Sequence, residues 1–375
     1  MIYTIFWIAF SFILYTYLLY PIIILTLSRV RKRPVRLEPV GDTLPAVTMI
    51  IVVYNEEDHV EEKIRNCLEL DYPRDLLTIC FVSDGSTDLT NEILRRHDEV
   101  VLIEDSKNRG KPHQLNRAAA YSKDPILAFS DVRQIYEPNA IRTLVRNFSD
   151  PEVGAVSGEL TFRRALDHTE QSIGLYWRYE KALRKAESAV DSTLGVTGAI
   201  YAIRRELFAP IPTDTILDDI EIPLHAFEMG YRVIFEPEAK AYDTAPSRID
   251  IEFRRKVRTL TGNFQLFRRN MWLFNPAKNR ILIQAVSHKL FRLIVPYALL
   301  TVLATSLLAG DGVMRTLLLI QLCFYTVGLA GLVREDLRNN RAINVITLFL
   351  VLNSASVMGL LRYLFSNTDA RWKRE

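Results

Sequence analysis

Five short polar segments hold the residues of this sequence that could do chemistry. They are residues 54–57 (Tyr54, Asn55, Glu56, Glu57), 83–88 with Asp84, 108–111 with Lys111, 129–133 with Asp131 and Arg133, and 213–221 with Asp218 and Asp219. A carboxylate can accept a hydrogen bond from a base imide or hold a cation, and adjacent carboxylates can supply a general base. A basic loop that opens a helix can meet phosphate.

Taken singly, each segment also has a purely structural explanation. Asn55 with the acids that follow it is typical of a helix start, and residues 83–88 are typical of a tight turn at Gly85 with a capping Asp88. Asp131 beside Arg133 is explained by a salt bridge, and acids are favoured near any helix N-terminus. The functional interpretation therefore depends on the five segments occurring together.

Strands alternate with amphipathic helices from residue 45 to about residue 249. Apolar runs predict strands over 46–53, 77–82, 100–103, 126–129 and 153–157, and periodic patterns predict helices over 56–70, 88–96, 111–122 and 138–148. This alternation predicts a mostly parallel sheet covered on both faces. In such sheets ligands bind beyond the carboxyl ends of the strands, where the sequence places Asn55, Asp84 and Asp131.

Apolar stretches at both ends of the chain reach the roughly 20 residues that cross a bilayer. Residues 2–27 carry no charge, and a basic run from Arg29 to Arg36 follows, so we expect a retained anchor with a cytosolic flank. Three further stretches lie at 293–309, 313–333 and 343–365, and the last could instead lie in the interface. Four crossings would place the basic tail at 371–374 outside, against the positive-inside rule, so the number of crossings stays open.

Residues 250–274 combine an apolar helical pattern with many basic side chains. Phe253, Val257, Phe264 and Phe267 recur at helical spacing, with arginines and lysines between them. Basic, aromatic amphipathic helices lie in membrane interfaces, although a basic helix packed on the preceding domain would show the same pattern.

The composition excludes several classes of protein. The 47 Lys and Arg residues against 44 Asp and Glu residues leave too small an excess to predict a nucleic-acid partner. Cys67, Cys80 and Cys323 lie far apart, which argues against a zinc site and against a secreted disulfide framework. Reduced thiols fit a cytoplasmic catalytic portion.

In this order and spacing, the five segments resemble the membrane-embedded family 2 glycosyltransferases of the GT-A fold, the branch related to cellulose, hyaluronan and poly-N-acetylglucosamine synthases. The resemblance covers residues 45–272, and the apolar ends extend it over nearly the whole chain. It implies an α/β, Rossmann-like, mostly parallel GT-A domain in the cytosol, flanked by N- and C-terminal transmembrane helices.

The resemblance also implies roles for individual residues. The implied nucleotide-sugar contacts are Tyr54, Asn55, Glu56, Asp84, Lys111, Asn116, Asp131, Arg133, Arg255 and Arg258. Among them Asp84 would hold the uracil of a UDP-sugar, and Lys111 with Asn116 would lie near the diphosphate. Gly198 and Ala199 would line the acceptor end. Asp218 and Asp219 stand where the family has Glu-Asp, which makes Asp219 the implied general base.

Two departures from the family pattern change what is expected. Arg133 replaces the second aspartate of the D-x-D metal motif, so Asp131 is left as the implied ligand of Mg²⁺ or Mn²⁺. Magnesium can bind through one carboxylate with diphosphate and water, so metal dependence is expected but weakened, and Arg133 could offset diphosphate charge directly. In the Q-x-x-R-W motif of the processive synthases, Arg258 is kept and Thr259 replaces the tryptophan, which puts long-chain synthesis in doubt.

The function implied is an inverting transfer of sugar from a UDP-sugar to a polysaccharide or oligosaccharide at the membrane. A lipid acceptor is the main alternative, and a catalytically silent membrane scaffold is the remaining one. Residues 1–28 would form the anchor, 45–249 the GT-A domain, 250–292 the amphipathic interfacial helices and 293–365 two or three spans. We expect a multi-pass protein of the plasma or inner membrane, with membrane lipids, and either a second copy or a partner subunit, as further partners.

Overall fold

The computed structural model describes residues 1–37, 44–163, 168–244 and 249–366, so the basic tail at 371–374 lies outside the described residues. The chain forms two compact units. One contains residues 31–163 and 187–244, and the other contains residues 1–30, 164–186 and 245–367. Residues 168–186, predicted from the sequence to belong to the sheet domain, group with the apolar helices.

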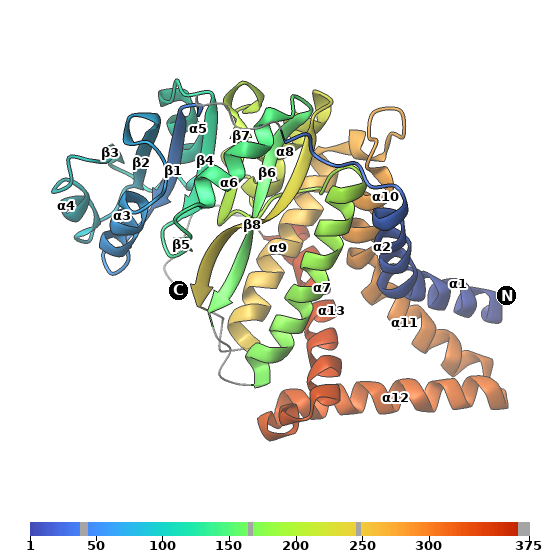
Figure 1. Ribbon diagram of the computed structural model, residues 1–375. Helices are drawn as coiled ribbons and strands as arrows, with labels where there is room; N and C mark the ends of the chain where they lie inside the picture. The colour runs from blue at the N-terminus through green and yellow to red at the C-terminus, as the bar shows by residue number, and fades with distance from the viewer. Residues whose placement is uncertain (38–43, 164–167, 245–248, 367–375) are drawn as a thin grey trace. The chain divides into compact units, whose positions relative to one another are not determined.

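The first unit is built on one eight-stranded sheet with the order β3-β2-β1-β4-β7-β6-β8-β5 (Figure 1). Its strands are β1 (Val47–Val53), β2 (Leu77–Asp84), β3 (Val101–Asp105), β4 (Ile126–Asp131), β5 (Ile135–Tyr136), β6 (Val153–Arg163), β7 (Ile200–Arg204) and β8 (Arg232–Thr244). Strands β3, β2, β1 and β4 are parallel, β7 is antiparallel to both of its neighbours, and β8 is parallel to β6. The mostly parallel α/β sheet predicted from the sequence is confirmed, with two antiparallel strands that the apolar runs did not predict: β7, and the edge strand β5, which is antiparallel to β8.

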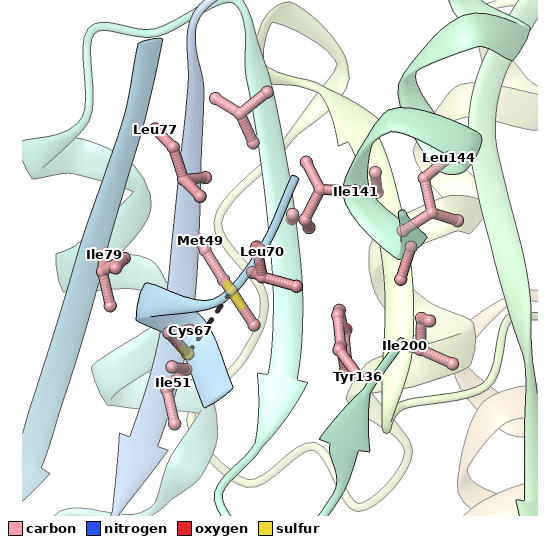
Figure 2. Close-up of a cluster of buried hydrophobic side chains, with 14 of the residues drawn as sticks. Met49, Ile51, Cys67, Leu70, Leu77, Ile79, Tyr136, Ile141, Leu144 and Ile200 are labelled. Carbon is pink, nitrogen blue, oxygen red and sulfur yellow. Dashed lines mark hydrogen bonds between the residues drawn. The ribbon is translucent and has the colours of Figure 1, made fainter. Parts of the chain in front are cut away.

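Helices cover this sheet because its central strands are apolar on both faces. The helices of the unit are α3 (Val60–Leu68), α4 (Thr90–Leu94), α5 (Lys111–Tyr121), α6 (Ala140–Val145) and α8 (Asp218–Glu228). Every residue of β1 is buried. Side chains of α3 and α6 pack against Met49, Ile51 and neighbouring strand residues in one core cluster (Figure 2). In that cluster the Cys67 thiol lies 3.9 Å from the Met49 sulfur.

Carboxyl ends of adjacent parallel strands lie beside one another in this sheet. Val52 of β1 pairs with Asp131 of β4, and Asp84 at the end of β2 pairs with Asp105 at the end of β3. The sheet therefore gathers side chains from segments that are far apart in the sequence at one edge, as parallel strands do.

The second unit is helical and carries every candidate membrane span found in the described residues. Its helices are α1 (Ile2–Leu14), α2 (Tyr20–Val30), α7 (His168–Val190), α9 (Ile249–Arg269), α10 (Leu282–Gln284), α11 (Phe291–Ala309), α12 (Gly312–Val333) and α13 (Arg341–Phe365). Four helical segments are long and apolar enough to cross a membrane: Ile2–Val30, Leu282–Ala309, Gly312–Val333 and Arg341–Phe365. They agree with the four apolar stretches recognised in the sequence.

Close helix contacts and one buried ion pair hold the second unit together. A Cβ atom at Gly331 of α12 would lie 2.2 Å from the Thr347 hydroxyl of α13, so the glycine permits the two helices to approach closely. Glu180 of α7 pairs with Arg292 and with His288, whose Nε2 lies 3.1 Å from its carboxylate. Such a buried carboxylate needs these partners because an unpaired charge in an apolar interior is costly.

The side of the membrane that carries the sheet unit is open to a labelling test. In Asp98→Cys, made in a Cys323→Ser background because Cys323 is the exposed cysteine, the new thiol lies on the exposed end of the α4 region. If the basic run after the first span is cytosolic, this thiol should resist an impermeant maleimide in intact cells and react after lysis. Labelling in intact cells would place the sheet unit on the outer side.

Candidate active site

A largely covered lysine joins two carboxylates that are far apart in the sequence. Asp131 ends β4, Asp218 begins α8, and the Lys111 ammonium at the start of α5 lies 2.8 Å from Asp131 and 3.3 Å from Asp218. The Lys111 side chain is 13% exposed and those of Asp131 and Asp218 are 31% and 11% exposed. Burial alone would lower the pKa of Lys111, but the charges of Asp131 and Asp218 raise it above its usual value, so the ammonium stays charged.

Asp219 lies next to the segment that was predicted to line the acceptor end. Its backbone carbonyl accepts a hydrogen bond from the Val196 amide at 3.0 Å. A Cβ atom at Gly198 would lie 3.5 Å from Asp219 Oδ2, so the glycine leaves room beside this carboxylate. Ala199 follows, and its carbonyl accepts a hydrogen bond from the Tyr136 hydroxyl at 3.2 Å. The structure thus brings Asp218, Asp219, Gly198, Asp131 and Lys111 into one region of the sheet unit.

Asp84 is buried and fastens the basic loop. Its carboxylate accepts hydrogen bonds from the backbone amides of Arg109 at 2.8 Å and Gly110 at 2.9 Å, and from the Gln114 side chain at 2.7 Å. The sequence predicted a nucleobase as the partner of this carboxylate. In the structure its partners belong to the loop and helix that present Lys111, and its contact with a nucleobase stays a prediction.

The turn after Asp84 approaches the same loop very closely. Gly85 has a φ of +73°, and a Cβ atom there would lie 2.6 Å from the Lys107 carbonyl carbon, so only glycine fits. Asn55 also has a positive φ, of 52°, and its side-chain oxygen accepts a hydrogen bond from the Thr87 amide at 2.8 Å. Helix α3 begins at Val60, so Asn55 is not its N-cap; it joins the loop after β1 to the turn after β2.

Glu56 and Arg133, both predicted to contact the nucleotide, contact each other. Arg133 Nη2 lies 3.0 Å and Nε 3.2 Å from Glu56 Oε1. The Glu56 side chain is 6% exposed, whereas that of Arg133 is 53% exposed. Glu56 therefore holds a guanidinium that faces solvent two residues after Asp131. Tyr54, at the end of the same loop, is half-buried.

The remaining residues implied to contact the nucleotide-sugar are Asn116, Arg255 and Arg258. The Asn116 amide donates to the Ile211 carbonyl at 2.8 Å and accepts from the Ile211 amide at 3.0 Å, so this side chain anchors the segment before α8. Arg255 and Arg258 are exposed on α9, which belongs to the helical unit.

The residues of this site could hold a divalent cation only if one carboxylate, that of Asp131, and the substrate supplied its ligands together. Within residues 1–37, 44–163, 168–244 and 249–366, no three His, Cys, Asp or Glu side chains are arranged to hold a metal ion. Asp131 is partly exposed, and magnesium is commonly bound by one or two carboxylates with diphosphate oxygens and water in the remaining positions. Asp131 would hold the cation, and the leaving diphosphate would supply most of its other ligands.

Sequence reasoning missed Gln114 and Lys63. Gln114 lies one helical turn after Lys111, where a polar side chain on α5 can reach back to Asp84. Lys63 lies on the face of α3 that is buried, together with Val60, Ile64 and Cys67. The spacing could have predicted this burial, because a lysine three residues after the buried Val60 lies on the same face of the helix.

Two family models match the chain. The model described as "Glycosyl transferase family 2" matches residues 48–211, and the model described as "Glycosyl transferase family group 2" matches residues 135–332. The first match contains the loop after β1, the lysine on α5 and the end of β4. The second extends through the acidic start of α8 into the apolar helices.

Curated relatives include poly-beta-1,6-N-acetyl-D-glucosamine synthases. That of Staphylococcus aureus strain MSSA476 is 24% identical over 243 residues, which cover 62% of this chain and 58% of the relative. That of Staphylococcus epidermidis strain ATCC 35984 is 23% identical over 240 residues, with 60% and 56% covered. The chain thus spans less than two thirds of the length of the relatives it matches.

A solved structure resembles the whole chain. A mannosyltransferase from Pyrobaculum calidifontis, in complex with GDP-Man and Mn²⁺, matches 97% of this chain and 99% of its own with a TM-score of 0.73 and 24% identity. This likeness confirms the fold class: a GT-A-like α/β sheet with N- and C-terminal apolar helices.

Proposed function

Because the chain belongs to the family 2 glycosyltransferases, we propose that it transfers a sugar from a nucleotide-sugar to an acceptor at the membrane in a single inverting displacement. The observation that carries the proposal is the meeting of Asp131, Lys111 and the Asp218-Asp219 pair at one edge of the sheet. A nucleotide-binding end, a charged centre and a candidate base are what such a displacement requires.

Asp219 is the general base in this proposal. The resemblance implies this role for Asp219, and Asp219 lies beside Gly198, which belongs to the segment expected at the acceptor end. Asp219 would take the proton from an acceptor hydroxyl as its oxygen attacks the anomeric carbon. The bond between that carbon and the diphosphate oxygen breaks in the same step, and the electron pair leaves with the nucleoside diphosphate.

Positive groups of the chain would stabilise the charge that builds on the departing diphosphate. Lys111 is held in place by Asp131 and Asp218, and Arg133 presents a half-exposed guanidinium held by Glu56. Preorganised charges of this kind supply a large part of catalysis in water-poor sites. A divalent cation bound at Asp131 would add Lewis-acid stabilisation of the same oxygens.

The donor in this proposal is a nucleotide-sugar, and the panel assay described next identifies its nucleobase. The sequence resemblance favours UDP, and the structural neighbour was solved with GDP-Man. The Asp84 carboxylate accepts hydrogen bonds from the loop amides and from Gln114, so in this proposal recognition of the base falls more heavily on Tyr54 and the positive-φ loop at Asn55 than the sequence implied.

A panel assay tests the proposal. Purified protein in lipid nanodiscs would be given UDP- and GDP-sugars with a membrane extract as the acceptor source, and release of nucleoside diphosphate and new glycosylated product would be measured. We expect one donor to give acceptor-dependent release. The product, identified by mass spectrometry, would separate a glycan acceptor from a lipid acceptor. Lack of release with every donor would contradict the proposal.

We expect short or lipid-linked products rather than a long polymer. The family's acceptor-stacking tryptophan is replaced by Thr259, and stacking of an aromatic ring is worth about 0.5 to 1.5 kcal/mol. Other aromatics are partly covered, since the Lys256 ammonium lies 5.5 Å from the Trp177 ring centre and the Arg292 guanidinium 5.5 Å from that of Tyr179.

Product length at limiting acceptor measures this expectation. Wild type should give ladders that start with one or two added sugars. Thr259→Trp should lengthen them, whereas Thr259→Leu, a matched apolar control without a ring, should not. High polymer from the first turnovers of the wild type, with no short intermediates, would refute the expectation.

A further inference from the structure

Lys63 is fully buried beneath the end of β4, with 0% of its surface exposed. Its ammonium donates hydrogen bonds to the Ser130 hydroxyl at 2.6 Å and to the Gln134 carbonyl at 2.6 Å. Ser130 precedes Asp131 and Gln134 follows Arg133, so the two bonds hold both ends of the turn that carries these two residues.

Further hydrogen bonds hold this turn within itself and to β8. The Ser130 hydroxyl also lies 3.0 Å from the Asp131 carbonyl, and the Gln134 amide donates to Asp243 of β8 at 2.7 Å. Lys63 lies within α3, and Glu56 lies just before this helix. The Glu56 carboxylate accepts a hydrogen bond from the Arg133 guanidinium. The segment around α3 therefore holds the 130–134 turn at two places, once through the buried ammonium of Lys63 and once through the buried carboxylate of Glu56.

Lys63 also supports the acceptor side of the site through Tyr136. The ammonium lies 4.5 Å from the centre of the Tyr136 ring, a cation–π distance. The Tyr136 hydroxyl donates to the Phe129 carbonyl at 2.7 Å and lies 3.2 Å from the Ala199 carbonyl. A shift of Lys63 would thus reach both the strand end that presents Asp131 and the segment beside Asp219.

We propose that Lys63 is a positioning residue for sugar transfer, which holds the 130–134 turn so that Asp131 and Arg133 meet the diphosphate. This inference rests on the proposed function, since it assigns the turn to the diphosphate end of the site. Lys63 itself does not touch the substrate, because its side chain is enclosed by the protein.

A lysine suits this position better than a neutral side chain of similar length. It satisfies a hydroxyl and a carbonyl that would otherwise be buried without donors, and such unsatisfied groups are costly. Burial lowers the pKa of Lys63 to about 8, so the ammonium is the main form at neutral pH.

The test compares Lys63→Met with Lys123→Met. Methionine has nearly the shape of the lysine stem but donates no hydrogen bond, and Lys123 is an exposed lysine of the same unit. We expect Lys63→Met to lower kcat by about 10- to 100-fold, as small misplacements of reacting groups do, while the donor KM changes less than about threefold. Lys123→Met should behave as wild type. An unchanged kcat in a folded Lys63→Met protein would overturn the proposal.

Ser130→Ala is the second variant, for the case in which Lys63→Met does not fold. It removes one of the two acceptors of Lys63 with little change in volume, and we expect a partial loss of kcat, about three- to tenfold. Adding Lys63→Met to it should cost less than the two single effects combined, because both act through one contact. Unchanged kcat in Ser130→Ala, or full additivity in the double variant, would count against the proposal.

Amide hydrogen exchange separates this inference from the proposed function. If the wild type transfers no sugar, the proposed function fails and kinetics cannot judge Lys63. Amide exchange at residues 131–134 can still test the role of Lys63. If Lys63→Met loosens the turn, these amides should exchange faster, while the exchange rates of β1 and β2 stay the same. Unaltered exchange at 131–134 would overturn the positioning role, whatever the activity.

Discussion

Asp219→Asn should lower kcat by about 10² to 10⁴-fold, the usual cost of losing a general base. Asparagine has the same shape and can still occupy the space beside Gly198, but it cannot accept the acceptor's proton. The nucleotide binds at the other end of the site, so the Kd for the nucleoside diphosphate should change less than about twofold. Steady-state kinetics and calorimetric titration would measure the two quantities.

Asp214→Asn is the matched control for this variant. Asp214 is an exposed aspartate in the loop that leads to α8, so the same chemical change is made close by in sequence but outside the proposed machinery. Its kcat should equal that of the wild type. If Asp219→Asn keeps more than about a tenth of the wild-type kcat, Asp219 is not the base, and Asp218 becomes the residue to change next.

Asp131→Ala should abolish measurable turnover and the strengthening of nucleotide binding by Mn²⁺. Asp131 is the carboxylate implied to hold the cation, and it is also the nearer partner of Lys111, so its loss removes a ligand and releases the lysine. Binding of the nucleoside diphosphate would be titrated with and without Mn²⁺. Asp98→Ala, which changes an exposed aspartate of the same unit, should leave both quantities unchanged.

The chelator experiment decides between a metal and the arginine at this position. We expect excess chelator to stop the wild-type reaction and added Mg²⁺ or Mn²⁺ to restore it. Full activity in chelator would mean that Arg133, two residues after Asp131 and with a half-exposed guanidinium, has taken over the role of the cation.

The pattern of apolar residues predicted the elements that are locally encoded. The run 46–53 became β1 (Val47–Val53), and 111–122 became α5 (Lys111–Tyr121), since both are apolar on the faces that the sheet buries. The pattern overestimated α3, expected from residue 56, because residues 55–59 form the loop that holds Thr87 and Arg133. The antiparallel orientation of β7 results from its pairing with β4 and β6, which are distant in sequence, so no local pattern encodes it.

The site residues divide in a similar way. Asp131, Lys111, Asp218 and Asp219 are brought together at the sheet edge as the motifs implied, because strand ends and helix starts meet there. Asp84 and Asn116 have the expected residue types, but their hydrogen bonds go to Gly110 and Ile211, and sequence alone does not reveal the partners of a polar side chain. Lys63 was not singled out from the sequence, since burial of a lysine needs acceptors that come from distant segments.

The configuration of the first product tests the central claim most directly. With the donor found by the panel, transfer would be followed by NMR from the first turnovers, before any later step could alter the new linkage. One displacement assisted by Asp219 predicts that an α-linked donor gives a β-linked product in wild type, and that Asp219→Asn forms this product about 10² to 10⁴-fold more slowly. An α-linked first product, or equal transfer by the two proteins, would contradict the account.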